Sequence, residues 1–220
     1  MRTAVIVEIE ELLFDTGVIR AAALHDALHH EGASIDADRL AKAHAGVPAA
    51  FALLRLAPLL TLDAIGLELA LHRANDTASQ AFALQTPLFD AEARNALERL
   101  SSECPIAVVT RASAAEAHQW LEGAGLEACV ATVRSLTTLD PADYVASWAD
   151  ALRRTHATCG VAIAAPAMLR VAQRAGLRTI QIGPDPDPDP YQSTDGYQPD
   201  AQLESLSQVH AAFLATLQQL

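Results

Sequence analysis

The chain has 220 residues, 51% of them hydrophobic and 19% charged, a composition typical of a folded globular protein that can bury a sizeable core. The formal net charge of -12 at pH 7 argues against nucleic acid and anionic membranes as partners, because both are bound mainly through Lys and Arg. The N-terminus lacks the pattern of a secretory signal, and no uninterrupted apolar run is long enough to span a bilayer, so we expect a cytoplasmic protein.

The first elements predicted along the chain are one strand and a group of helices. Residues 3–9 form a short apolar run rich in β-branched residues, which predicts a strand. Residues 19–85 are rich in Ala and Leu, which predicts about four helices. Helix breaks are expected where glycine, proline or short polar residues cluster, at 32–34, 46–48, 58–62 and 75–77.

From Pro87 the pattern changes to alternating helices and strands. Helices are predicted at 90–100, 114–124, 141–155 and 167–175, and strands at 106–110, 129–133, 160–164 and 179–182. This alternation predicts an α/β fold with a parallel sheet and right-handed crossovers. Ligands of such sheets bind at the carboxyl ends of the strands, which are Glu8, Thr110, Ala164 and Gly183.

Three other features favour structural readings over functional ones. Residues 184–190 alternate Pro and Asp, which predicts an extended solvated loop rather than a calcium site. His25 and His29 have a spacing that can bind zinc, but without a Glu in a His-Glu-x-x-His arrangement they are expected to be surface histidines. The cysteines are widely spaced and odd in number, and we expect reduced thiols at Cys104, Cys129 and Cys159.

Several segments carry a resemblance to a known family. Residues 8–16, Glu-Ile-Glu-Glu-Leu-Leu-Phe-Asp-Thr, keep the spacing of the opening motif of the haloacid dehalogenase (HAD) superfamily, Asp-x-Asp-Gly-(Thr/Val)-Leu-x-Asp-(Thr/Ser). The strand ending in Thr110 resembles the second motif, and residues 160–180 resemble the fourth motif with the spacing of the capped phosphatase and β-phosphoglucomutase branch. The resemblance implies a HAD-like Rossmannoid core, residues 1–16 and 86–220, with an all-helical cap domain inserted at 17–85.

The same resemblance suggests roles for individual residues. Glu8 stands at the position of the nucleophile and Glu10 at that of the general acid and base. Both are one methylene longer than the family's aspartates, and a displacement of about 1 Å can cost roughly 100-fold in rate. Thr110 matches the phosphate-binding residue of the second motif, and Arg111 and Asp15 are further candidates for ligand binding.

Other catalytic groups of the family are missing. The third motif supplies a lysine, but Thr138 or Asp140 stands in its place, and the single lysine of the chain is Lys42 in the cap segment. Arg111 or Arg134 could substitute for it. The magnesium-binding acids of the fourth motif are replaced by Ile163 and Ala164, so although Mg²⁺ is the family's cofactor we expect no metal or other cofactor here.

These losses favour a pseudoenzyme, although three hypotheses stay open. The first is a protein that binds a small molecule or a protein partner between cap and core without phosphatase activity. The second is a weak or altered hydrolase that uses Glu8 and Glu10, and the third is a structural subunit, which would include a homo-oligomer. Glu8, Glu10 and Glu11 are expected to form an acidic cluster that repels phosphate and has no assigned cation to balance it.

Overall fold

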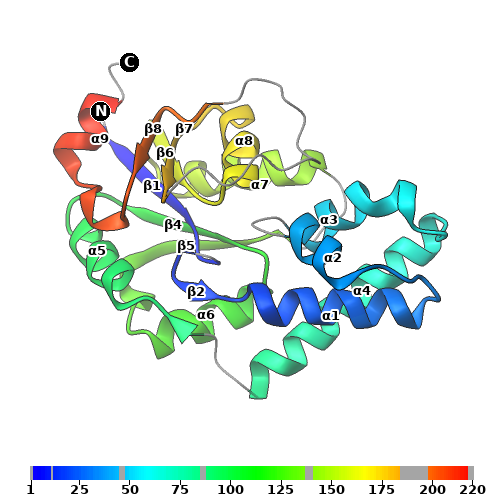
Figure 1. The fold of residues 1–220 in the computed structure, drawn as a ribbon. Helices are drawn as coiled ribbons and strands as arrows, with labels where there is room; N and C mark the ends of the chain where they lie inside the picture. The colour runs from blue at the N-terminus through cyan, green and yellow to red at the C-terminus, as the bar shows by residue number, and fades with distance from the viewer. Residues whose placement is uncertain are drawn as a thin grey trace.

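The computed structural model describes residues 2–10, 12–44, 48–84, 88–136, 141–183 and 198–217. Within them, six parallel strands form one sheet in the order β5-β4-β1-β6-β7-β8 (Figure 1). The strands are β1 (Thr3–Glu8), β4 (Ile106–Thr110), β5 (Val130–Ser135), β6 (Cys159–Ile163), β7 (Arg178–Ile182) and β8 (Ala201–Leu203). Because β1 lies between β4 and β6, Glu8 ends a central strand of the sheet.

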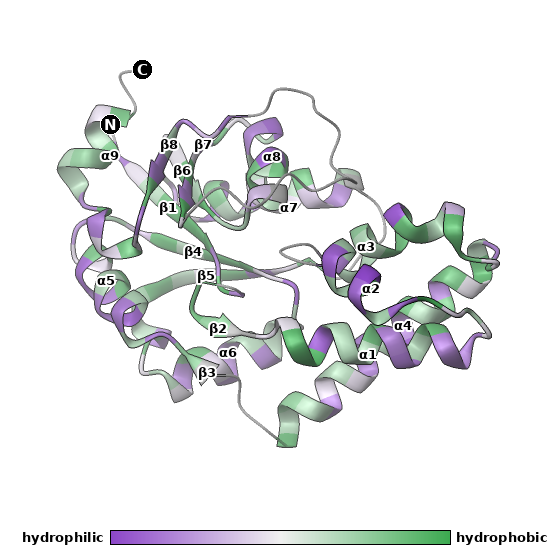
Figure 2. Cartoon of the chain, in the orientation of Figure 1, coloured by the Kyte–Doolittle hydropathy of each residue, from purple (hydrophilic) through white to green (hydrophobic). Residues whose placement is uncertain are grey.

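Helices cover both faces of this sheet. Strand β1 alternates its side chains, with Val5 and Val7 in one hydrophobic cluster and Ile6 in another. The first cluster includes residues of α5 (Ala91–Ser101), α6 (Ala114–Gly123) and α9 (Ala211–Leu217), and the second includes residues of α7 (Pro141–Arg154) and α8 (Pro166–Arg174). The central strands are mainly hydrophobic, as Figure 2 shows, because both of their faces are buried.

A helical layer lies to one side of the sheet (Figure 1). It consists of α1 (Gly17–His30), α2 (Ala37–His44), α3 (Ala49–Leu56) and α4 (Ala64–Leu84), which share a hydrophobic cluster of their own. A short antiparallel pair, β2 (Phe14–Asp15) with β3 (Leu88–Phe89), lies where the chain leaves and re-enters the sheet domain. This layer matches the predicted cap in position, and the domain bounds 17–85 stay a prediction. The remaining elements are short 3₁₀ turns, η1 (Ala57–Leu59), η2 (Glu127–Cys129) and η3 (Leu206–Gln208).

The α/β class is confirmed, and one predicted helix break is wrong. Helix α4 runs through residues 75–77 without interruption. Its buried residues recur at three- and four-residue spacing and form one stripe, Ala70, Leu71, Ala74, Ala78 and Phe82. Packing of this stripe, much of it against α1, outweighs the low helix propensity of Asn75-Asp76-Thr77. In the part of the chain described, no helix combines the length and hydropathy that crossing a membrane requires.

Candidate functional site

Glu8 is fully buried at the end of β1 and is paired with a cation from the chain itself. The Arg111 Nε lies 3.2 Å from Glu8 Oε1, and the arginine side chain is only 2% exposed. The Ala165 N–H, at the start of α8, donates to Glu8 Oε2 at 3.1 Å, where the positive end of the helix dipole also favours a carboxylate. Both carboxylate oxygens of Glu8, the residue at the nucleophile position, are therefore in contact with positively polarised groups of the chain.

Glu10 lies in the loop that follows β1 and is also fully buried. Its Oε1 accepts three hydrogen bonds, from Thr110 Oγ1 at 2.6 Å, Arg111 N at 2.7 Å and Ala112 N at 3.0 Å. In the part of the chain that the structure describes, Glu10 Oε2 has no hydrogen-bond partner. One carboxylate oxygen thus accepts hydrogen bonds from the Thr110 hydroxyl and from the two amides that follow it at the end of β4. The family resemblance assigns this segment to phosphate binding.

Arg20 brings a second positive charge from the cap. Its Nη2 lies 3.9 Å from Glu10 Oε1, and its guanidinium lies over the Phe82 ring, 5.1 Å from the centroid. Arg20 is 7% exposed, because it belongs to the face of α1 that buries Ala23, Leu24 and Ala27. Cap helix α1 is thereby connected to the sheet domain by charge as well as by apolar packing.

His44 and Tyr144 complete the buried group of polar side chains. Burial raises the pKa of the Tyr144 hydroxyl above its usual range, and that hydroxyl donates to the Leu136 carbonyl at 3.3 Å. Phe51 of α3 packs on the Tyr144 ring with centroids 4.7 Å apart, which closes this part of the boundary between cap and core. His44, at the end of α2, is 2% exposed, and its Nε2 has no hydrogen-bond partner within the described residues.

The buried imidazole predicts a pH dependence of stability. Burial, followed by the charges of Arg111 and Arg20, lowers the pKa of His44 from 6.5 to about 3. Below pH 6.5 the unfolded chain therefore takes up a proton that the folded chain does not, and the free energy of unfolding falls by about 1.4 kcal/mol per pH unit until the pH nears the folded pKa.

Urea unfolding of the wild type and of His44→Leu at pH 7 and pH 5 checks this prediction. The wild type is expected to lose about 2 kcal/mol more than the variant between these pH values. The other seven histidines contribute to both proteins alike, so equal losses would show that His44 is not buried in its neutral form.

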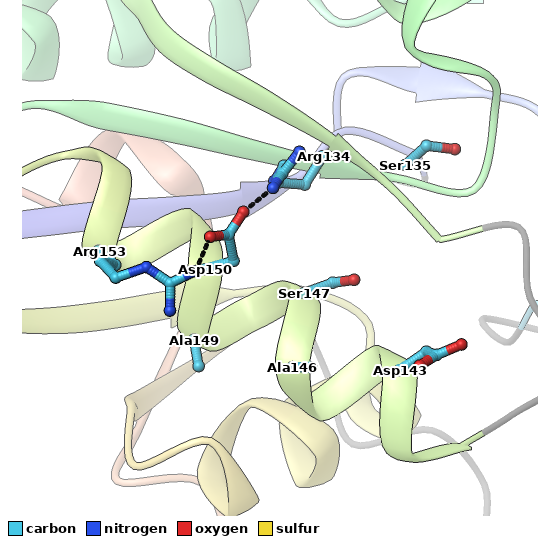
Figure 3. A pocket seen from close by; sticks show the side chains of 8 residues that line it. All are labelled: Arg134, Ser135, Asp143, Ala146, Ser147, Ala149, Asp150 and Arg153. Carbon is cyan, nitrogen blue, oxygen red and sulfur yellow. Dashed lines mark hydrogen bonds and ion pairs between the residues drawn. The ribbon is translucent and has the colours of Figure 1, made fainter.

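The structure brings together four of the five predicted site residues: Glu8, Glu10, Thr110 and Arg111. Asp15 lies in β2, and the orientation of its side chain is outside the described part, as are Glu11, Thr138 and Asp140. The expectation that no cation balances Glu8 and Glu10 is wrong, because Arg111 lies beside Glu8 and Arg20 beside Glu10. Of the two arginines suggested in place of the lysine, Arg111 reaches Glu8, whereas Arg134 pairs with Asp150 on α7 (Figure 3).

Sequence reasoning missed Arg20, His44 and Tyr144, yet a signal for them was present. Each stands at helical spacing from residues that the structure buries: Arg20 with Ala23 and Leu24, His44 with Leu40, and Tyr144 with Trp148. A charged or polar residue in line with an apolar stripe is the feature that marks a buried polar site.

The residues that the structure describes do not fit a magnesium ion, the cofactor that the family resemblance implies. At the end of β6, Ile163 and Ala164 are buried and offer no side-chain oxygen, whereas Mg²⁺ requires oxygen ligands. The Glu8 carboxylate, which would be the remaining ligand, is already paired with Arg111. Among the residues described, no group of three or more His, Cys, Asp or Glu is placed to hold a metal.

Comparison with known proteins supports the fold. No protein-family model and no curated protein matches the sequence. Among solved structures, the chain is similar to a haloacid dehalogenase-like hydrolase of Streptococcus pneumoniae, with a TM-score of 0.68 at 16% identity over 98% of each chain. It is also similar to CbbY of Rhodobacter sphaeroides, solved in complex with phosphate, with a TM-score of 0.69 at 16% identity over 99% of this chain and 100% of that one.

A third similar structure is the β-phosphoglucomutase of Clostridium difficile, with a TM-score of 0.69 at 12% identity over 100% of this chain and 98% of that one. These likenesses cover nearly the whole length of every chain compared. The protein therefore has the capped HAD-like hydrolase fold. At such low identities the likeness concerns the fold, and the chemistry has to be argued from the side chains.

Proposed function

We propose that this chain is a cytoplasmic pseudoenzyme of the HAD-like fold, which has lost phosphatase turnover and binds a small molecule or a protein partner at the boundary between cap and core. The observation that carries the proposal is the position of Glu10. Its Oε1 accepts hydrogen bonds from Thr110 Oγ1 and from the Arg111 and Ala112 amides. These are the donors that a phosphoryl oxygen would need.

The state of Glu8 supports the same conclusion. Nucleophilic attack requires a carboxylate oxygen that is directed at the phosphorus and a cation that balances the charge of the phosphoryl group. Here Arg111 lies against Glu8 Oε1 and the Ala165 amide holds Oε2. An incoming phosphate ester would have to displace a buried ion pair before it could react.

The charges of the site also balance without a ligand. Within the described residues, Glu8 and Glu10 are matched by Arg111 and Arg20, and burial keeps His44 neutral. A phosphate group would add negative charge to a buried site with no excess cation, which is costly at low dielectric. We therefore propose that the natural ligand of this boundary carries no phosphoryl group.

Turnover of a broad panel of phosphomonoesters, with and without Mg²⁺, tests the proposal. The wild type and Glu8→Ala, purified identically, are expected to release phosphate at the same background rate. Activity that depends on Glu8 in either condition would overturn it.

One observation favours an altered hydrolase as the second candidate. Arg111 places a positive charge beside Glu8, where the family resemblance expects a lysine. Such an enzyme would work without a metal, so turnover that needs Glu8 and Arg111 but is insensitive to Mg²⁺ would identify it.

A further inference from the structure

A polar pocket lies at the edge of the sheet, apart from Glu8 and Glu10. It has a volume of about 670 Å³ and opens between edge strand β5 and helix α7 (Figure 3). The lining residues are Arg134 and Ser135 of β5 and Asp143, Ala146, Ser147, Ala149, Asp150 and Arg153 of α7. Two of the α7 positions that line it are alanines, and its volume is within the range of small-molecule sites.

One carboxylate at the end of this pocket is surrounded by arginines. Asp150, with its side chain 12% exposed, pairs with Arg134 across from β5 and with Arg153 one turn further along α7. Arg154 Nε also donates to Asp150 Oδ2, at 2.9 Å. Within the described residues this cluster gathers three guanidinium charges around one carboxylate, an excess of two positive charges in a chain whose net charge is -12.

The cluster keeps unused capacity to bind an anion. A guanidinium has five N–H donors in a planar fork that matches carboxylate and phosphate oxygens. The side chains of Arg153 and Arg154 are 74% and 52% exposed, so their outer donors face solvent. Burial lowers the pKa of Arg134, and the neighbouring charges of Arg154 and Arg153 lower it further.

We propose that this pocket is a binding site for a small molecule with a multivalent oxyanion, either a phosphoryl group or a pair of carboxylates. The oxyanion would lie against Arg134 and Arg153, and the rest of the ligand would extend past the Ser147 hydroxyl toward Ala146. Asp143 lines the opposite end of the pocket (Figure 3) and disfavours an anion there, which fixes the direction of the ligand. The site is independent of any turnover at Glu8.

Titration of the ¹⁵N-labelled protein with inorganic phosphate and with citrate, at constant ionic strength set by sodium chloride, tests the proposal. At least one of the two anions is expected to cause saturable shifts of the Ser147 amide and the Arg153 side chain, and the pair separates a phosphoryl from a polycarboxylate preference. Arg153→Ala is expected to weaken the affinity about tenfold or more, since it removes charge-assisted hydrogen bonds.

The matched control is Arg39→Ala, which removes the same charge from an exposed position on cap helix α2 and is expected to leave the affinity unchanged. Both replaced arginines are exposed, so neither variant is expected to unfold. The absence of a saturable shift with either anion would overturn the proposal. An equal loss of affinity in Arg39→Ala would also overturn it, because the attraction would then be diffuse.

Discussion

Arg111→Ala is expected to lower the free energy of unfolding by about 3–5 kcal/mol, because it leaves the Glu8 carboxylate buried without its cation. Glu8 is fully buried and Arg111 is 2% exposed, so water cannot replace the missing charge without a rearrangement of the site. The midpoint of urea unfolding at pH 7 measures the loss.

Two variants separate the lost ion pair from general damage to the core. The double variant Glu8→Gln/Arg111→Met removes both charges at similar volume and is expected to be much closer to the wild type than Arg111→Ala. Arg94→Ala breaks the Arg94–Glu98 pair on α5, where both side chains are 41% exposed, and is expected to cost less than about 1 kcal/mol. If Arg111→Ala lowers the free energy of unfolding by no more than Arg94→Ala does, the ion pair between Arg111 and Glu8 does not stabilise the site.

Glu10→Ala is expected to create a binding site for phosphate that the wild type lacks. The substitution removes the acceptor of the Thr110 hydroxyl and of the Arg111 amide, and one of the two acceptors of the Ala112 amide, which also donates to Thr110 Oγ1. It also removes one carboxylate beside the Arg20 guanidinium. A buried donor left without an acceptor costs about 1–3 kcal/mol, and an oxyanion would satisfy both the Thr110 hydroxyl and the Arg111 amide. Phosphate at about 100 times its Kd would add about 2.7 kcal/mol to the stability of the variant, which thermal unfolding with and without phosphate detects.

Glu10→Gln is the matched control for this gain. The glutamine side chain has the same length, and its amide oxygen still accepts from the same three donors, although the charge is lost. We expect Glu10→Gln to bind no phosphate at this site, and Glu10→Ala/Thr110→Val to bind more weakly than Glu10→Ala. Equal responses of Glu10→Ala and Glu10→Gln would show that the side chain does not occupy the donors.

Much of the fold could be predicted because its signals are local. The alternation of β-branched runs and helical segments from Pro87 onward predicted the parallel sheet, and strands β4, β6 and β7 lie within one residue of their expected bounds. The order of the strands depends on which runs meet in space, and the sequence pattern does not contain that order. The break expected at 75–77 failed for a related reason, since the packing of α4 is a tertiary effect.

The proximity of the candidate site residues could be predicted from the sequence, but the pairing of their charges could not. Glu8 and Thr110 end the neighbouring strands β1 and β4, and Glu10 and Arg111 come just after them, so their proximity followed from the fold. The cations could not be assigned, because Arg20 reaches Glu10 from a different part of the chain and because helices α1 and α2 carry many other polar residues. The hydrogen bonds from Thr110 and the two amides to Glu10 Oε1 depend on distances of a few tenths of an ångström, which the sequence does not contain.

A crystal structure of the wild-type protein grown with phosphate and Mg²⁺ would test most directly whether the site is filled by the chain itself. We expect Glu10 Oε1 to remain bonded to Thr110 Oγ1 and to the Arg111 and Ala112 amides, with Arg111 against Glu8 and neither ion between cap and core. Phosphate on the β4 loop in place of the Glu10 carboxylate, with Mg²⁺ on Glu8, would contradict it.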